Sequence, residues 1–237
     1  MSQIRRSQFL TTYGPGAILE GKDGPRVILS VELSGVFQRN HTDFEITDQR
    51  LSRGLLDGAG ILRLPSNAEL GKPEKSWIYR TRRFPSWSLC TKHGVLYRKT
   101  NNNSKACPLC NELDSETKAW EQANRQLIRF VRACPDGHLD DVDWIRLVRH
   151  KTSDCSPGYL FWRGSGALKN ITISCPLCKE KANLGEAYAR EWNCSGRFPE
   201  RELGDPYRPG CDEKSRIIQR GAANLRIPEI QTALVIP

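Results

Sequence analysis

The chain has 237 residues, enough for one large domain or two modest ones. It carries 36 Lys and Arg against 27 Asp and Glu, a net charge of +9 that favours anionic partners such as nucleic acid or acidic membrane surfaces. No apolar run approaches the roughly 18 residues of a membrane-spanning helix, and the first residues lack the apolar stretch of a secretory signal. We therefore expect a cytoplasmic protein, where disulfides are rare and closely spaced cysteines indicate metal.

The first 89 residues contain no cysteine and predict short strands. Apolar runs at residues 27–31 and 60–64 are separated by Gly, Pro, Asn and Asp, which is typical of strands and turns. We expect a strand-rich region at residues 1–85 and a zinc-binding region at residues 86–237, or one continuous domain across both. The expected fold is α+β and loop-rich, with zinc-ribbon-like modules and short strands stabilised by zinc.

A basic and aromatic segment at residues 77–87 interleaves three arginines with four aromatic side chains. Such mixtures suit single-stranded DNA, because bases stack on rings while arginines hold phosphates. The alternative is that the aromatic rings pack beneath a zinc site while the arginines face solvent. The candidate DNA-binding residues are Arg80, Arg82, Arg83 and Trp87.

Helical periodicity predicts helices at residues 112–128, 139–150 and 182–192. On a helix, Arg125, Arg129 and Arg132 would share one face. The apolar run at residues 225–236 needs a partner to cover it, either within this chain or in a longer protein of which this chain is the front part.

The clearest motif is a zinc-ribbon pattern in which one His replaces a Cys. Cys90-x2-His93 is followed, after 13 residues, by Cys107-x2-Cys110. A Cys-x-x-Cys turn presents two thiolates from one tight loop, and two such half-sites supply the four tetrahedral ligands of structural zinc.

The other cysteines and two histidines supply eight further candidate ligands. Cys175-x2-Cys178 is a second half-site, which Cys194 and Cys211 would complete as an all-thiolate site. A third set would consist of Cys134, His138, His150 and Cys155. The alternative for this third set is a polar turn residue at His138 and an apolar buried thiol at Cys155. The sequence thus predicts zinc at two or three sites.

Motifs of catalysis are missing from the sequence. There is no G-x4-G-K-[ST] phosphate loop and no H-E-x-x-H helix. All candidate zinc sites are closed by four protein ligands, whereas catalytic zinc keeps a position for water. A nuclease site at His138, Asp140 and Asp141 is an alternative, although acidic residues at a helix start are explained more simply by capping. We therefore expect a protein that is not an enzyme.

Several stretches spread over the chain resemble the DrmB family of the DISARM anti-phage defence system. They are Arg5–Leu10, Tyr13–Ala17, Arg83–Pro85, Ala133–Asp141, Cys194–Arg197 and Gln219–Asn224.

The resemblance implies an accessory subunit that works on DNA with the helicase subunit of the same defence system. The DNA would be single-stranded or at a junction of single and double strands, and no membrane partner is expected. Family members are longer, so the resemblance also implies that this chain corresponds to their N-terminal portion. His93 stands where the family more often has Cys, and it remains a competent zinc ligand. A protein–protein scaffold without DNA contact is the remaining alternative.

Overall fold

The computed structural model describes residues 6–21, 24–33, 41–73, 79–98, 107–110, 125–203, 207–222 and 225. Within these residues the helices are short and most strands have two to five residues. No helix in the described ranges is long and apolar enough to cross a membrane. The fold is thus of the expected class, with few helices and many short antiparallel strands in small sheets.

In the part of the chain that the structure describes, the helices and strands are the following, in chain order. The helices are α1 (Arg6–Thr11), α2 (Gln49–Leu55), α4 (Trp144–Leu147) and α5 (Leu184–Ala189), with single 3-10 turns η1 (Val31–Leu33), η2 (His41–Phe44), η3 (Leu168–Asn170) and η4 (Pro199–Arg201). The strands are β1 (Ile18–Gly21), β2 (Gly24–Ile28), β3 (Glu45–Ile46), β4 (Ile61–Leu62), β5 (Thr81–Arg83), β6 (Trp87–Cys90), β7 (Val95–Arg98), β8 (Arg125–Leu127), β9 (Phe130–Ala133), β10 (Leu139–Asp141), β11 (Tyr159–Arg163), β12 (Thr172–Ser174), β13 (Lys181–Asn183), β14 (Glu191–Asn193) and β15 (Lys214–Gln219).

The described residues divide into two compact units. One unit comprises residues 6–82 and 199–203, and the other comprises residues 83–198 and 207–225. The division at residue 85 expected from the sequence stays a prediction.

The first unit contains the sheet β1-β2-β5 and the two-stranded sheet β3-β4. In β2, Val27 and Ile28 are almost completely buried, and Val27 lies opposite Ile18 of β1. The guanidinium of Arg26 donates to the hydroxyl and the carbonyl of Thr81, at 2.8 and 3.0 Å. In place of the strand predicted at residues 27–31, the structure has β2 three residues earlier, at Gly24–Ile28. Strand β4 occupies part of the apolar run at residues 60–64.

The second unit contains a six-stranded antiparallel sheet in the order β13-β12-β11-β7-β6-β8. Leu96 of β7 lies opposite Leu160 of β11, and Ile173 of β12 lies opposite Trp162. Leu96, Leu160 and Ile173 have no exposed surface. These apolar side chains form the core of the unit together with Trp144 of α4 and Leu184 of α5.

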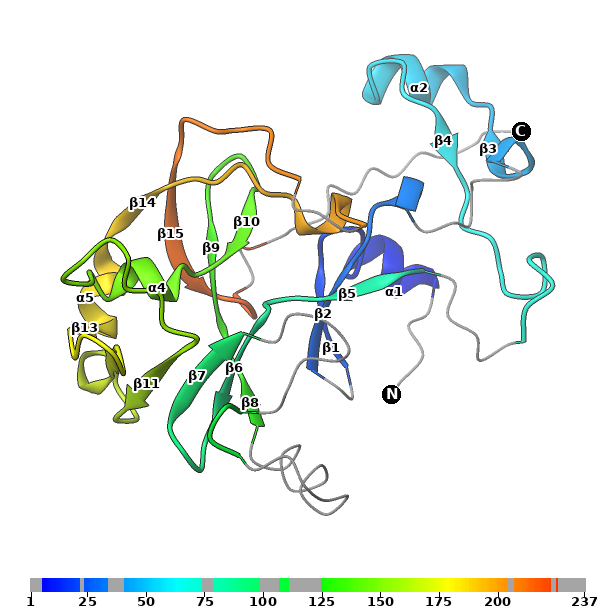
Figure 1. Cartoon of the computed structure of the whole chain (residues 1–237). Coiled ribbons are helices and arrows are strands. Elements are labelled where there is room, and N and C mark those ends of the chain that lie inside the picture. The colour runs from blue at the N-terminus through cyan, green and yellow to red at the C-terminus, as the bar shows by residue number, and fades with distance from the viewer. Residues whose placement is uncertain are drawn as a thin grey trace. The chain divides into compact units, whose positions relative to one another are not determined.

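A second sheet in this unit has four strands in the order β10-β9-β15-β14 (Figure 1). Along β15, Ser215 and Ile217 are buried while their neighbours are more exposed, which is the alternation expected of a strand with one covered face. Ala133 at the end of β9 lies opposite Leu139 and Arg216. Consequently, one end of the sheet brings together the last residues of β9 and β14 and the first residues of β10 and β15.

The helices predicted from periodicity were largely wrong. Residues 139–141 form strand β10, and only Trp144–Leu147 of the segment 139–150 is helical. The segment 182–192 holds α5 with strand residues at both ends, and residues 125–128 of the first predicted helix are strand β8 and the residue after it. Residues 112–124 and 226–236 lie outside the described residues. Pairing with neighbouring strands overrides local helical periodicity at these positions.

Candidate metal centres

The first candidate centre joins the turn after β6 to a second turn at residues 107–110. The Nδ1 atom of His93 lies 3.6 Å from the sulfur of Cys90, 3.7 Å from that of Cys107 and 3.5 Å from that of Cys110. The sulfurs of Cys90 and Cys110 are 4.0 Å apart. These four residues are the zinc-ribbon set that the sequence predicts, and all three cysteines are buried.

The spacing of these atoms fits zinc. A tetrahedral zinc with Zn–S of about 2.3 Å and Zn–N of about 2.0–2.1 Å holds sulfurs about 3.8 Å apart, and sulfur and nitrogen about 3.6 Å apart. The distances around His93 and between the sulfurs of Cys90 and Cys110 match both values within a few tenths of an ångström. Soft thiolates with one imidazole are the ligands that zinc prefers.

The second centre lies at that end of the four-stranded sheet where β9 and β14 end and β10 and β15 begin. Cys134 and His138 belong to the turn between β9 and β10, and Cys194 and Cys211 belong to the connection between β14 and β15. Their ligand atoms all lie within 4.8 Å of one another, with Cys134 Sγ 3.2 Å from His138 Nδ1. Antiparallel pairing places the two turns side by side and so brings together residues up to 77 positions apart in the sequence.

The third centre joins the segment after α4 to the turn between β12 and β13. It consists of His150, Cys155, Cys175 and Cys178. The sulfurs of Cys155 and Cys175 are 3.7 Å apart, and His150 Nδ1 lies 3.3 Å from the sulfur of Cys178.

His150 shows how a neighbouring group orients a candidate ligand. Its other ring nitrogen, Nε2, lies 3.0 Å from the carbonyl oxygen of Ile145. Because Nε2–H donates to this carbonyl, Nδ1 is unprotonated and directs its lone pair at the cluster. Metal-binding histidines are commonly held by such a second hydrogen bond.

The twelve candidate ligands thus gather in three sets of four, but the sets differ from those expected. The sequence-based grouping of Cys175 and Cys178 with Cys194 and Cys211 was wrong. The four residues left over for a third set divide between two centres: Cys134 and His138 join the second, and His150 and Cys155 join the third. Strand pairing, which spacing along the chain does not reveal, decides the partners.

Backbone N–H groups support the thiol ligands. Leu177 N–H donates to the sulfur of Cys175 at 3.3 Å, and Gly196 N–H donates to the sulfur of Cys194 at 3.3 Å. Glu213 N–H donates in the same way to Cys211, at 3.4 Å. Such bonds stabilise negative charge on sulfur, which is the form that binds metal.

Without metal, the protonated form is favoured at three thiols, one in each centre. Burial raises the pKa of Cys107 to about 12 and that of Cys211 to about 12, and it raises the pKa of Cys155 to about 11. At Cys178, burial acts in the same direction but hydrogen bonds from the backbone of Glu180 and from His150 outweigh it, so that the pKa falls to about 6. Metal binding must therefore displace protons from Cys107, Cys155 and Cys211, and affinity should rise with pH.

The two aspartates of the nuclease alternative are engaged in a buried ion-pair network. Arg197, whose side chain is 5% exposed, donates to Asp140 at 2.6 Å and to Asp141 at 3.2 Å. The N–H and hydroxyl of Ser86 also donate to Asp141, at 2.7 and 2.8 Å. Burial opposes ionisation of Asp140, but the charge of Arg197 and the hydrogen bond from its guanidinium hold the pKa of Asp140 below the usual value. Both carboxylates are thus held by ion pairs and hydrogen bonds, and His138 belongs to the second candidate centre.

The candidate DNA-binding segment divides into residues of different exposure. Trp87 is 7% exposed and packs in the core of the second unit, which leaves little of its ring accessible for stacking on a base. Arg82 forms an ion pair with Glu202, whose side chain is completely buried. Arg80 is exposed and Arg83 is half-buried. Trp77 lies outside the described residues.

A family model supplies the identification. The model of a domain of unknown function, DUF8724, matches residues 5–227. The chain belongs to the DUF8724 family. The match includes all twelve candidate ligands, since they lie between residues 90 and 211.

The chain is also similar to a protein of the DISARM system. The DISARM protein DrmB of Bacillus paralicheniformis (strain ATCC 9945a / NCIMB 11709 / CD-2) is 32% identical over 117 residues, which cover 46% of this chain and 20% of that protein. The DrmB-like relationship expected from the sequence motifs is confirmed. The matched region spans about a fifth of the length of that relative.

Proposed function

We propose that the chain is a zinc-binding, non-catalytic accessory subunit of a DISARM-type anti-phage complex in the cytoplasm. In this proposal it works with the helicase subunit of the same system and helps that subunit to engage DNA. The observation that carries the proposal is the set of three four-ligand clusters in a DrmB-like chain.

The composition of the clusters favours a structural role for zinc. Each cluster offers four Cys or His ligand atoms within 4.8 Å of one another. Four protein ligands complete the coordination of zinc and leave no position for a water or a substrate. In this role the zinc ions would hold turns together and would take no part in a chemical step.

The charge of the chain supports contact with DNA. A net charge of +9 favours salt-dependent binding to phosphates. Within the segment selected from the sequence, we propose Arg80 and Arg83 as the DNA contacts, because Arg82 compensates the buried charge of Glu202 and Trp87 is in the core.

The test is a titration of the zinc-loaded chain with labelled single-stranded and double-stranded oligonucleotides at two salt concentrations, with and without magnesium. We expect binding that weakens with salt and leaves the oligonucleotide intact. Each arginine that contacts a phosphate of a single strand contributes about 0.7 to the slope of log affinity against log salt. Arg80→Ala should reduce the slope by this amount, whereas Arg53→Ala should not; Arg53 is an exposed arginine on α2 of the same unit.

Other outcomes would redirect the proposal. Magnesium-dependent cleavage of the oligonucleotide would favour the alternative that the chain is a nuclease. Tight binding to the helicase subunit without any affinity for DNA at low salt would favour a protein–protein scaffold.

A further inference from the structure

A pocket of about 400 Å³ opens in the second unit next to the first candidate centre, since its lining residues Thr91 and Gly94 directly follow the candidate ligands Cys90 and His93. Its walls come from the ends of β6 and β8, the residues that lead into β9, the end of β11 and the loop at residues 164–166. The volume lies in the range of small-molecule and nucleotide sites.

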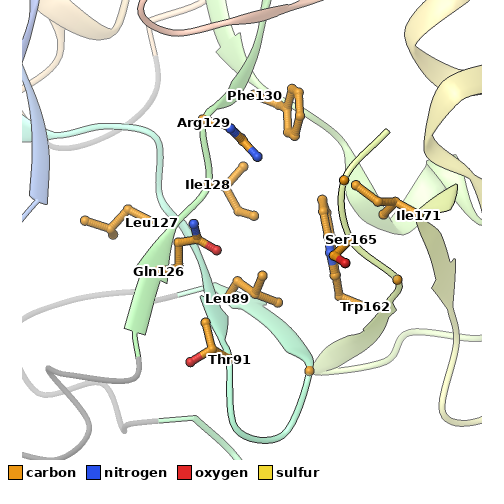
Figure 2. A pocket seen from close by; sticks show the side chains of 13 residues that line it. Leu89, Thr91, Gln126, Leu127, Ile128, Arg129, Phe130, Trp162, Ser165 and Ile171 are labelled. Carbon is orange, nitrogen blue, oxygen red and sulfur yellow. The ribbon is translucent and has the colours of Figure 1, made fainter. Parts of the chain in front are cut away.

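The interior of the pocket is apolar and firmly held. Leu89, Ile128 and Ile171 are buried members of the core. Trp162 is half-buried, and its ring packs edge-to-face against the completely buried Trp144, with centroids 5.9 Å apart. Figure 2 shows Ile128 and Trp162 on opposite sides of the pocket. The space between an aliphatic side chain and a fixed indole ring suits a flat, aromatic group.

The loop wall is fixed by a glycine. Gly164 has φ +92°, and a Cβ atom there would lie 2.0 Å from the carbonyl oxygen of Asn170. Only glycine allows the backbone to lie this close, and it places Ser165 at the pocket.

Polar groups surround the opening. Gln126, Thr91 and Ser165 are exposed and offer amide and hydroxyl groups, and Figure 2 shows Arg129 and Thr91 at opposite ends. Among the described residues that line the pocket, Arg129 alone is charged and none is acidic. A carboxamide can pair with the edge of a base, and an arginine at the rim attracts a phosphate.

We propose that this pocket receives one unpaired base of a single DNA strand. The base lies between Ile128 and Trp162, Gln126 contacts its edge, and Arg129 holds the adjacent phosphate. The inference rests on the proposed contact with DNA and adds to it a built site for a nucleotide.

The test compares a labelled oligothymidylate with an abasic strand of the same length and charge. The zinc-loaded wild-type chain should bind the oligothymidylate at least about fivefold more tightly, because stacking of one base is lost in the abasic strand.

Ser165→Phe, which places a ring at the rim, should remove this preference. Arg129→Ala should lower the salt slope by about 0.7. Arg146→Ala is the matched control, since the Arg146 side chain is 86% exposed on α4 and does not line the pocket.

A cross-linking measurement identifies the site directly. An oligonucleotide that carries 5-iodouracil should form a photo-adduct with the peptide containing Trp162. Equal binding of abasic and normal strands, with adducts elsewhere, would overturn the pocket and leave the proposed DNA contact intact. No binding of either strand at low salt would overturn both. Competition by a peptide with no effect of the bases would assign the pocket to a protein partner and contradict the proposal.

Discussion

At the scale of single residues, the buried arginine Arg197 connects several parts of the second unit. It bonds to Asp140 and Asp141 on β10, and its guanidinium lies 5.5 Å from the ring centroid of Phe84. Its carbonyl accepts from Leu139 N–H at 2.9 Å. Loss of this side chain would remove the buried cation shared by the two carboxylates; Asp140 would keep Arg132 and Arg208, at 3.6 and 3.5 Å, and Asp141 would keep the hydrogen bonds from Ser86.

We therefore expect Arg197→Ala to lower the free energy of unfolding by about 3–5 kcal/mol, the usual cost of breaking a buried ion pair from one side. Urea unfolding of the zinc-loaded chain measures this change. Arg216→Ala is the control, because the ion pair of Arg216 with Glu191 is exposed and should contribute about 1 kcal/mol or less. Equal effects of the two substitutions would contradict the structural role of Arg197.

At the scale of elements, a glycine permits the close approach of two parts of the connection between β14 and β15, the loops around Cys194 and Cys211. Gly196 has φ +67°, and a Cβ atom there would lie 2.7 Å from the backbone of Gly210. Gly210 also has positive φ, at +95°, but a Cβ atom there would meet nothing within 4 Å. Alanine substitutions at the two positions therefore distinguish the effect of a steric clash, at Gly196, from the effect of backbone strain alone, at Gly210.

Gly196→Ala should push the loops apart and weaken zinc binding at the second centre on the order of tenfold, as changes around a metal site commonly do. Gly210→Ala should have a smaller effect, since it adds only strain. The measurement is the rate at which a chromogenic chelator removes zinc: one of the bound ions should leave faster from the Gly196 variant. Unchanged release from this variant would show that the loops do not need their close approach.

The elements also show what the sequence could and could not predict. All twelve candidate ligands were identifiable because Cys and His occur at zinc-ligand spacings, and the first set was complete within 21 residues. The other two sets depend on which strands pair, as at Cys134 and Cys194, and pairing is decided by long-range packing. The helix expected at residues 139–150 failed for the same reason, since β10 pairs with β9.

At the scale of the whole molecule, all three clusters belong to the second unit. The strands of this unit are mostly of three to five residues, and each cluster fixes turns between them. Structural zinc in small domains contributes on the order of 10–16 kcal/mol of apparent binding free energy, as much as the usual net stability of a domain.

Removal of zinc by a strong chelator should therefore unfold the second unit and leave the first unit folded. Hydrogen exchange followed by mass spectrometry measures this: β7, β11 and β12 should lose protection, whereas β1 and β2 should keep it. Re-addition of zinc should restore the protection. Retention of protection in β11 and β12 after complete zinc removal would show that the core of the unit does not need the metal.

The most direct test of the three-centre arrangement is the zinc count of two double variants by native mass spectrometry. His150→Ala with Cys178→Ala removes two ligands of one centre, so two zinc ions should remain. Cys178→Ala with Cys194→Ala removes one ligand from each of two centres, so one zinc ion should remain. The reverse counts, one and two, would support the grouping by sequence proximity and contradict the structure, and a wild-type chain that binds no zinc would contradict the account as a whole.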